Sequence, residues 1–198
     1  TGSSVQFSLP TRCRPLVTAV ILAAGTSSRM GCCKQLLPWE NTPLVQLVAK
    51  NALASPVDEV VVVIGYQAYQ VKAALQHLPV KIVVNPDFET GQGSSLVAGI
   101  KAASPRAEAF VILLADQPLI TAHIIGHLLS LYQQSLPLAL RPTYRRQPGH
   151  PVIMSAALRP QLENLGGDEG ACSLLATLKS QVINLEVNDV GVVFDIDT

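Results

Sequence analysis

Four apolar runs of strand length recur along this chain, and stretches of helical character separate them. The runs are rich in Val and Ile and cover residues 16–23, 59–64, 80–84 and 110–115. Continuous apolar runs are typical of strands that are buried on both faces, as in parallel sheets covered by helices. Their alternation with helices predicts an α/β fold with a mainly parallel sheet and right-handed crossovers.

The segments between the runs predict the helices. Thr42 and Pro43 have the order of an N-cap and a first-turn proline, and they predict a helix that ends near Ala54. Thr121 is the predicted N-cap of a helix with one apolar stripe at positions 124, 125, 128, 129, 131 and 132. We expect further helices at residues 67–77, 94–103, 155–162 and 170–178, and late strands at 182–187 and 192–196. The proline-rich residues 136–155 depart from the simple alternation.

Length and composition narrow the class of protein. The 198 residues suit one domain with a sizeable core, and 48% hydrophobic against 14% charged residues argues against disorder. A formal net charge of zero argues against a protein that holds nucleic acid through its phosphates. No apolar run approaches the length of a membrane span, and the first residues lack the apolar core of a signal peptide. We expect a flexible leader or a remnant of cloning at residues 1–15, one domain at 16–198, no membrane contact and a cytoplasmic location.

The cysteines fit reduced thiols rather than a metal centre. Cys13, Cys32, Cys33 and Cys172 form no C-x-x-C pair and no zinc spacing. Cys32 and Cys33 are adjacent, which is poor geometry for a mutual disulfide. A redox or ligand role for that pair stays open because of its place in the loop described next.

The first apolar run leads into a loop of small and polar residues, VILAAGTSSRMGCCKQLLPW at residues 20–39. Gly25 and Gly31 let the backbone approach an anion, and Arg29 and Lys34 supply positive charge. The spacing matches neither G-x-G-x-x-G nor the P-loop. The order predicts a buried strand that opens into a phosphate-binding loop, and a glycine-rich turn with incidental charges is the alternative.

Carboxylates stand at two places where a metal ion would serve a triphosphate. Asp116 follows the fourth apolar run, and ligands of parallel sheets collect at the carboxyl ends of strands. Asp195 and Asp197 alternate with Ile196 in the final GVVFDIDT, so they face one side of an extended segment. A turn-starting aspartate and an exposed acidic end are the respective alternatives.

The segment LAAGTSSRMGCCKQLLPW resembles the signature L-A-[AG]-G-x-S-x-R-M-G-x-x-K-x-L-L of the nucleotidyltransferases related to molybdenum cofactor synthesis. The resemblance covers nearly all of residues 18–198. It implies a single Rossmann-like three-layer domain of the nucleotide-diphospho-sugar transferase type. It also implies that Arg29, Lys34 and Asp116 are catalytic and that Asp116, Asp195 and Asp197 hold Mg²⁺. The implied nucleotide-binding residues are Leu22, Ala23, Ala24, Gly25, Ser27, Arg29, Lys34, Gly93 and Ser94.

Two further elements resemble the family where it binds its acceptor. Gly149-His150-Pro151 matches a G-H-P element, and GGDEGAC at residues 166–172 resembles G-D-x-G-A-R, with Cys172 where arginine is usual. They imply acceptor contacts through His150 and Asp168, and a structural role for His150 stays open. The turn NPDFETGQGSS at residues 85–95 corresponds to the base and ribose pocket of the family, and simple helix capping is its alternative. Trp39, the only tryptophan, fits core packing.

These resemblances imply transfer of CMP from CTP to the terminal phosphate of the molybdopterin cofactor, with release of pyrophosphate. Ala24 favours CTP, because the guanylyltransferase branch usually has glycine there. The alternatives are a guanylyltransferase that uses GTP, a sugar-phosphate nucleotidyltransferase, and a non-catalytic nucleotide-binding relative. The implied cofactor is Mg²⁺, and the implied partners are a nucleoside triphosphate, a molybdopterin-type acceptor and a molybdenum hydroxylase or its chaperone.

Overall fold

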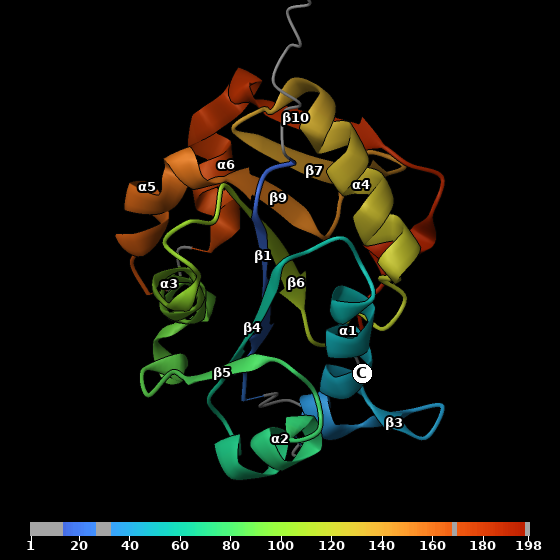
Figure 1. The fold of residues 1–198 in the computed structure, drawn as a ribbon, viewed down its shortest axis with the longest axis vertical. Helices are drawn as coiled ribbons and strands as arrows, with labels where there is room; N and C mark the ends of the chain where they lie inside the picture. The colour runs from blue at the N-terminus through green and yellow to red at the C-terminus, as the bar shows by residue number, and fades with distance from the viewer. Residues whose placement is uncertain (1–13, 27–32, 168–169, 197–198) are drawn as a thin grey trace, which may run out of the picture.

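The computed structural model describes residues 14–26, 33–167 and 170–196. They form three layers, with a central sheet between two sets of helices (Figure 1). The strands of the main sheet are β1 (Val17–Ala23), β4 (Glu59–Ile64), β5 (Lys81–Val84), β6 (Ala109–Leu114), β7 (Ala139–Tyr144), β8 (Gln147–Pro148), β9 (Val152–Ser155) and β10 (Val182–Glu186). The expected α/β class, the mainly parallel sheet and the single three-layer domain are confirmed.

The strand order is β10–β7–β9–β6–β1–β4–β5, and β8 pairs with β7. β1 runs parallel to both β4 and β6, so that Leu22 lies opposite Val63 on one side and Leu114 on the other. β9 is antiparallel to β6 and β7. The carboxyl ends of β1, β4 and β6 therefore meet at one edge of the sheet, where α/β proteins bind their ligands.

Two apolar cores lie on opposite faces of the sheet. Along β1, Ile21 belongs to the core under α1 (Leu44–Leu53), α2 (Ala68–Leu75) and α4 (Ala122–Ser135). Its neighbour Val20 belongs to the core under α3 (Gln92–Ala102), α5 (Arg159–Glu163) and α6 (Ala171–Leu178). Successive side chains of a strand point to opposite faces, so both faces of these strands need apolar residues. This explains the continuous apolar runs of the sequence.

The predicted N-cap at Thr42 is wrong. Thr42 and Pro43 form the short strand β3 (Thr42–Pro43), which pairs in antiparallel fashion with β2 (Pro38–Trp39). α1 begins only at Leu44, and no side chain caps it. By contrast, the Thr121 cap is confirmed, because its Oγ1 accepts a hydrogen bond of 3.3 Å from the backbone N–H of Ile124.

The predicted strand at residues 192–196 is also wrong. The chain forms a short 3₁₀-helix at Val190–Val192 and then has no regular secondary structure as far as Ile196. The predicted helix at residues 155–162 divides into a 3₁₀-helix at Ala156–Leu158 and α5. Ser155 itself ends β9.

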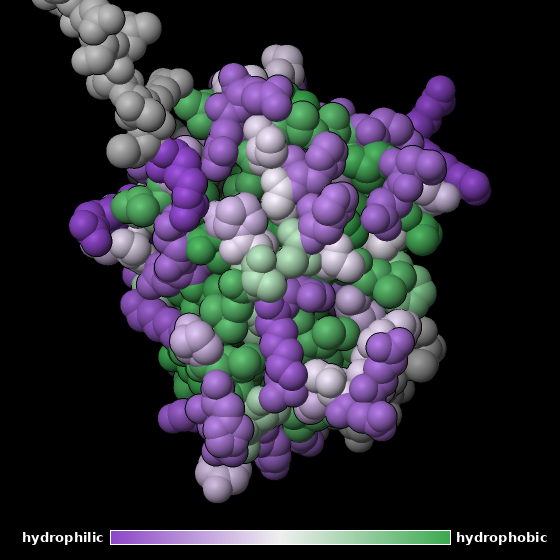
Figure 2. All heavy atoms as spheres, turned by 45° about the vertical axis from the view of Figure 1, so that its right-hand side comes forward, coloured by the Kyte–Doolittle hydropathy of each residue, from purple (hydrophilic) through white to green (hydrophobic). Residues whose placement is uncertain are grey.

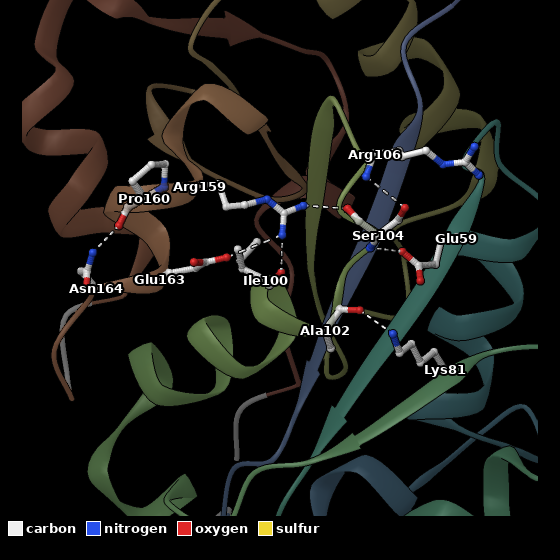
Figure 3. Close-up of polar contacts among 10 residues, drawn as sticks. All are labelled: Glu59, Lys81, Ile100, Ala102, Ser104, Arg106, Arg159, Pro160, Glu163 and Asn164. Carbon is white, nitrogen blue, oxygen red and sulfur yellow. Dashed lines mark hydrogen bonds and ion pairs between the residues drawn. The ribbon is translucent and has the colours of Figure 1, made fainter.

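Cations hold the carboxyl end of α3, at the edge of the sheet opposite the ligand-binding edge (Figure 3). Arg159 donates hydrogen bonds to the carbonyl groups of Ile100, at 3.0 Å, and Ser104, at 2.7 Å. Lys81 donates to the carbonyl of Ala102 at 2.6 Å. Positive charge at this end complements the helix dipole. These hydrogen bonds fix α3 in an orientation in which the amino end of the helix lies at the ligand-binding edge.

Figure 2 brings the α4 side of the molecule forward, and polar and apolar side chains are interspersed over this face. Within the described residues, no helix is both long and apolar enough to cross a membrane. Large apolar side chains that remain exposed, such as Tyr69 and Val84, come from separate elements, α2 and β5.

Candidate functional site

A cleft of about 580 Å³ opens at the carboxyl ends of β1 and β6. The end of β1, the residues after it, a short 3₁₀-helix at Lys34–Leu36, the amino end of α3 and the end of β6 contribute to its walls. The lining residues are Leu22, Ala24, Gly25, Thr26, Lys34, Gln35, Phe88, Glu89, Gly91, Gln92, Ser95, Leu114, Ala115 and Asp116. The topology thus places the described ends of the predicted phosphate loop and the predicted metal carboxylate in one cleft.

Lys34 and Asp116 form an ion pair inside this cleft. The Nζ atom of Lys34 lies 2.9 Å from Oδ2 of Asp116, although the two residues are 82 positions apart in the chain. The side chain of Lys34 is only 11% exposed and that of Asp116 27% exposed. Lys34, which is predicted to bind phosphate, and Asp116, which is predicted to bind the metal, therefore compensate each other's charge in a largely covered position.

The remaining residues predicted from the loop divide into three groups. Leu22, Ala24 and Gly25 line the cleft. Ala23 points to the opposite face of β1 and is buried in the core under α1. Ser27 and Arg29 lie outside the described residues.

Gln35 is a site residue that sequence patterns did not indicate. It is 7% exposed, and its Nε2 donates to the carbonyl of Gly25 at 3.0 Å. Its Oε1 accepts a hydrogen bond of 3.1 Å from the Cys33 thiol. One amide thereby joins the two described ends of the predicted phosphate loop. The only feature of the sequence that could indicate this role is an uncharged polar residue between Lys34 and two leucines.

The turn before α3 reaches the cleft through residues next to those predicted. Gly91, Gln92 and Ser95 line the cleft, whereas the predicted Gly93 is buried and Ser94 lines a neighbouring depression. The backbone N–H groups at this amino end of α3 form the positive end of the helix dipole. The turn therefore presents the kind of surface that attracts an anion.

A network around Asn85 holds this turn. Asn85 is 4% exposed, and its Nδ2 donates to the hydroxyl groups of Ser94, at 2.9 Å, and Ser95, at 3.1 Å. The Ser94 hydroxyl in turn donates to the carbonyl groups of Gly91, at 2.8 Å, and Asp87, at 3.0 Å. Ser94 thus supports the shape of the turn, whereas no side chain caps the amino end of α3.

The C-terminal segment returns to the end of β6 (Figure 1). The backbone N–H of Ile196 donates to the carbonyl of Asp116 at 3.1 Å. This bond places the backbone of Asp195, whose side chain is exposed, next to Asp116. Asp197 lies outside the described residues.

His150 anchors the same segment from the other side. Its backbone N–H donates to the carbonyl of Val192 at 2.8 Å. A side chain on Gly149 would bring a Cβ within 2.3 Å of that carbonyl oxygen, so the close approach requires glycine. Burial lowers the pKa of His150 to about 4, an effect that the Asp116 charge opposes and the Arg141 charge reinforces. At neutral pH His150 is therefore uncharged, and it can offer an acceptor a hydrogen bond but no positive charge.

The second predicted acceptor element lies against the turn before α3. A Cβ on Gly167 would lie 2.9 Å from the carbonyl oxygen of Thr90, so the two backbones are in close contact. Cys172 is exposed at the start of α6. Asp168 lies outside the described residues.

The described ranges contain no group of three His, Cys, Asp or Glu side chains that could hold a metal ion. Mg²⁺ requires less from the protein, because it usually binds one or two carboxylates together with substrate phosphates and water. Asp116 in the cleft supplies that kind of oxygen ligand, and the exposed Asp195 follows on the backbone beside it. The donor set therefore fits a cation that arrives with a triphosphate.

The sequence profile of the MobA-like NTP transferase domain matches residues 19–182. A protein named nicotine blue oxidoreductase from Paenarthrobacter nicotinovorans is 36% identical over 93% of each chain. The purine catabolism protein PucB of Bacillus subtilis is 35% identical, also over 93% of each chain. The molybdenum cofactor cytidylyltransferase of Escherichia coli is 29% identical over 92% of this chain and 91% of its own.

Solved structures agree with the sequence matches. The crystal structure of Rv0371c from Mycobacterium tuberculosis superimposes with a TM-score of 0.79 at 28% identity, over 88% of this chain and 89% of that one. A second structure of Rv0371c, a complex with manganese, has a TM-score of 0.76. The family indicated by the loop signature is confirmed. The chain belongs to the MobA-like NTP transferase family.

Proposed function

We propose that this protein transfers CMP from CTP to the terminal phosphate of the molybdopterin cofactor and releases pyrophosphate. The observation that carries the proposal is the cleft that contains both Lys34 and Asp116 at the carboxyl ends of β1 and β6. The relative named molybdenum cofactor cytidylyltransferase supports the choice of reaction, since it aligns over nine-tenths of both chains.

The cleft suits a reaction that depends on positioning and charge. An acceptor phosphate oxygen attacks the α-phosphorus in line, the bond to the bridging oxygen breaks, and pyrophosphate leaves with the electron pair. A phosphate acceptor is already ionised near neutral pH, so no general base is needed. We propose that Lys34 and Arg29 offset the charge of the triphosphate, and that the amino end of α3 adds its dipole.

We propose that Asp116, Asp195 and Asp197 hold Mg²⁺. When bound, the cation would neutralise phosphate oxygens and orient the α-phosphate. The manganese complex of Rv0371c supports a divalent cation in a protein of this fold. Asp116 begins the reaction cycle paired with Lys34, so its carboxylate is oriented before the cation arrives.

The base pocket is proposed to prefer cytosine. Ala24 is at the wall of the cleft but only 3% exposed, and its carbonyl accepts a hydrogen bond of 3.1 Å from the N–H of Tyr66, which fixes this part of the backbone. A methyl group here narrows the space beside a base. We place the acceptor near His150 and Asp168, and we propose that a molybdenum hydroxylase or its chaperone receives the product.

Pyrophosphate release measures this function directly. We expect release with CTP, Mg²⁺ and molybdopterin together, and little without any one of them. Release with GTP in preference to CTP would indicate a guanylyltransferase, and release with a sugar phosphate would indicate a sugar-phosphate nucleotidyltransferase. Nucleotide binding without release would indicate a non-catalytic relative.

A second candidate function follows from the 36% identity to the protein named nicotine blue oxidoreductase. An oxidoreductase would change the oxidation state of nicotine blue together with a redox cosubstrate such as a nicotinamide dinucleotide. The chain lacks the G-x-G-x-x-G loop of the common dinucleotide fold, which favours the transferase. The same purified protein in both assays separates the two candidates.

A further inference from the structure

An aromatic contact connects the C-terminal segment to the region that follows the phosphate loop. The rings of Trp39 and Phe194 lie edge to face, with centroids 6.2 Å apart and planes at 65°. Both side chains are half-buried. Trp39 belongs to β2, and Phe194 immediately precedes Asp195. The contact therefore joins elements that the chain separates by more than 150 positions.

Phe194 lies between two backbone anchors of the segment. Upstream, the carbonyl of Val192 accepts from the N–H of His150, and downstream the N–H of Ile196 donates to the carbonyl of Asp116. The residues between these anchors have no regular secondary structure. Such a segment has a large conformational entropy to lose, and the packing of Phe194 on Trp39 is one contact that restricts it between the anchors.

Trp39 is itself connected to the side of the cleft that contains Lys34. The short 3₁₀-helix that begins at Lys34 ends one residue before β2. Leu37, which joins them, accepts a hydrogen bond of 3.0 Å from the N–H of Leu44 at the start of α1. The β2–β3 hairpin is thus fixed to α1, which also contacts the 3₁₀-helix that begins at Lys34. A displacement of Trp39 would therefore move the backbone next to Lys34.

We propose that Trp39 and Phe194 are positioning residues that hold Asp195 at the divalent-cation site and couple it to the Lys34 side of the cleft. The inference rests on the proposed function, because it takes Asp116 and Asp195 as ligands of the cation. Neither aromatic ring contacts the cation. Each acts by limiting where the Asp195 carboxylate can be.

The size of the effect follows from the contact. Edge-to-face aromatic pairs contribute enough for loss of the pair to weaken a linked equilibrium by about three- to tenfold. Removal of either ring destroys the same contact. Trp39→Ala and Phe194→Ala should therefore each weaken cation binding by that factor, and the double variant should be about as weak as either single variant.

Binding of Mn²⁺ to the full chain, followed by the electron paramagnetic resonance signal of the free ion, tests the proposal without turnover. Phe194→Tyr and Trp39→Phe keep an edge-to-face pair and should restore near wild-type affinity. The emission of Trp39, the only tryptophan, gives a second readout in the wild type and in Phe194→Ala. We expect Mn²⁺ to change this emission less in the variant at equal Mn²⁺ concentration.

Tyr132→Leu is the matched control for general destabilisation. Tyr132 is 2% exposed and lies near the far end of α4, roughly 16 Å along the helix axis from Thr121. The substitution should lower the melting temperature and leave Mn²⁺ affinity unchanged. If it weakens Mn²⁺ binding as much as Phe194→Ala does, the effect is general and the positioning role is overturned.

Asp116→Asn separates this inference from the proposed function. If Mn²⁺ binding is lost in Asp116→Asn but is of wild-type strength in Trp39→Ala and Phe194→Ala, the metal site stands and the positioning role is overturned. Additive losses in the double variant also overturn it. If Asp116→Asn binds Mn²⁺ like the wild type, or the wild type binds none, the metal assignment of the proposed function fails and the inference fails with it.

Discussion

The ammonium group of Lys34 lies 2.9 Å from the carboxylate of Asp116 in the cleft at the carboxyl ends of β1 and β6. Lys34 occupies the place beside Asp116 that we propose for the divalent cation. Asp116 occupies the place beside Lys34 that we propose for the triphosphate. The pair keeps two charges compensated in a largely covered site, where an unpaired charge would be costly. Binding of a triphosphate with its cation would replace the Lys34–Asp116 pair by a contact between Lys34 and phosphate and a contact between Asp116 and the cation.

Replacement of Lys34 by alanine should weaken CTP binding by roughly tenfold or more, because a hydrogen bond to a charged group contributes about 1.5–3 kcal/mol. Isothermal titration calorimetry with CTP measures the change. Lys50→Ala is the matched control, since Lys50 is an exposed lysine on α1. Wild-type affinity in Lys34→Ala would remove Lys34 from the phosphate site.

Replacement of Gln35 by leucine should cost about 1–2 kcal/mol of unfolding free energy and should also weaken CTP binding. The substitution removes the two hydrogen bonds that join Gly25 to Cys33. Gln46→Leu removes a similar bond, from Nε2 to the carbonyl of Ala74, on α1 away from the cleft. Urea denaturation and CTP titration of both variants separate the effects. Equal CTP affinity in the two variants would argue against a role for Gln35 in shaping the loop.

Acid should destabilise the protein through His150. The pKa of His150 is about 4 in the folded state and about 6.5 in the unfolded state, so the unfolded chain takes up the proton first. The contribution of His150 to stability is intact above pH 6.5, declines as the pH falls from about 6.5 to 4, and amounts to about 2–3 kcal/mol. Unfolding free energies of wild type and His150→Gln, measured across this range, should therefore converge at low pH. A constant difference between the two proteins would show that the folded state does not exclude the imidazolium.

The base preference should be modest if Ala24 alone sets it. One methyl group beside a base discriminates by about 1–3 kcal/mol, which corresponds to roughly tenfold to a hundredfold in favour of CTP over GTP. Ala24→Gly should reduce that ratio, and competition between the two nucleotides in a turnover assay measures it. Equal or better use of GTP by the wild type would assign the protein to guanylyl transfer and would leave the Lys34 and Asp116 arguments unchanged.

The sequence was sufficient for the layers of the fold and for the meeting of Lys34 with Asp116. Continuous apolar runs predict buried parallel strands, and parallel strands bring their carboxyl ends together, so Lys34 and Asp116 share a cleft although 82 positions separate them. Sequence motifs do not show which charged groups pair when no ligand is bound. For this reason the motifs predict a phosphate ligand for Lys34 and a metal ligand for Asp116, and they do not predict the ion pair between the two side chains.

Other features depend on tertiary contacts that local patterns do not contain. Thr42 and Pro43 have helix-start character, but pairing with β2 makes them a strand. Residues 192–196 are mostly apolar, as in a strand, yet single backbone bonds to His150 and Asp116 hold them instead of a sheet edge. Gln35 is buried only because the chain after the loop folds back onto Gly25.

The central claim is that Asp116 supports a cation-dependent nucleotidyl transfer, and Asp116→Asn tests it most directly. The substitution keeps the shape of the side chain and removes its charge. We measure pyrophosphate release from CTP with molybdopterin and Mg²⁺, together with the melting temperature. The account predicts that release falls to background in a protein that still folds, with a melting temperature lowered because Lys34 loses the carboxylate charge beside it. Wild-type release of pyrophosphate by Asp116→Asn would contradict it.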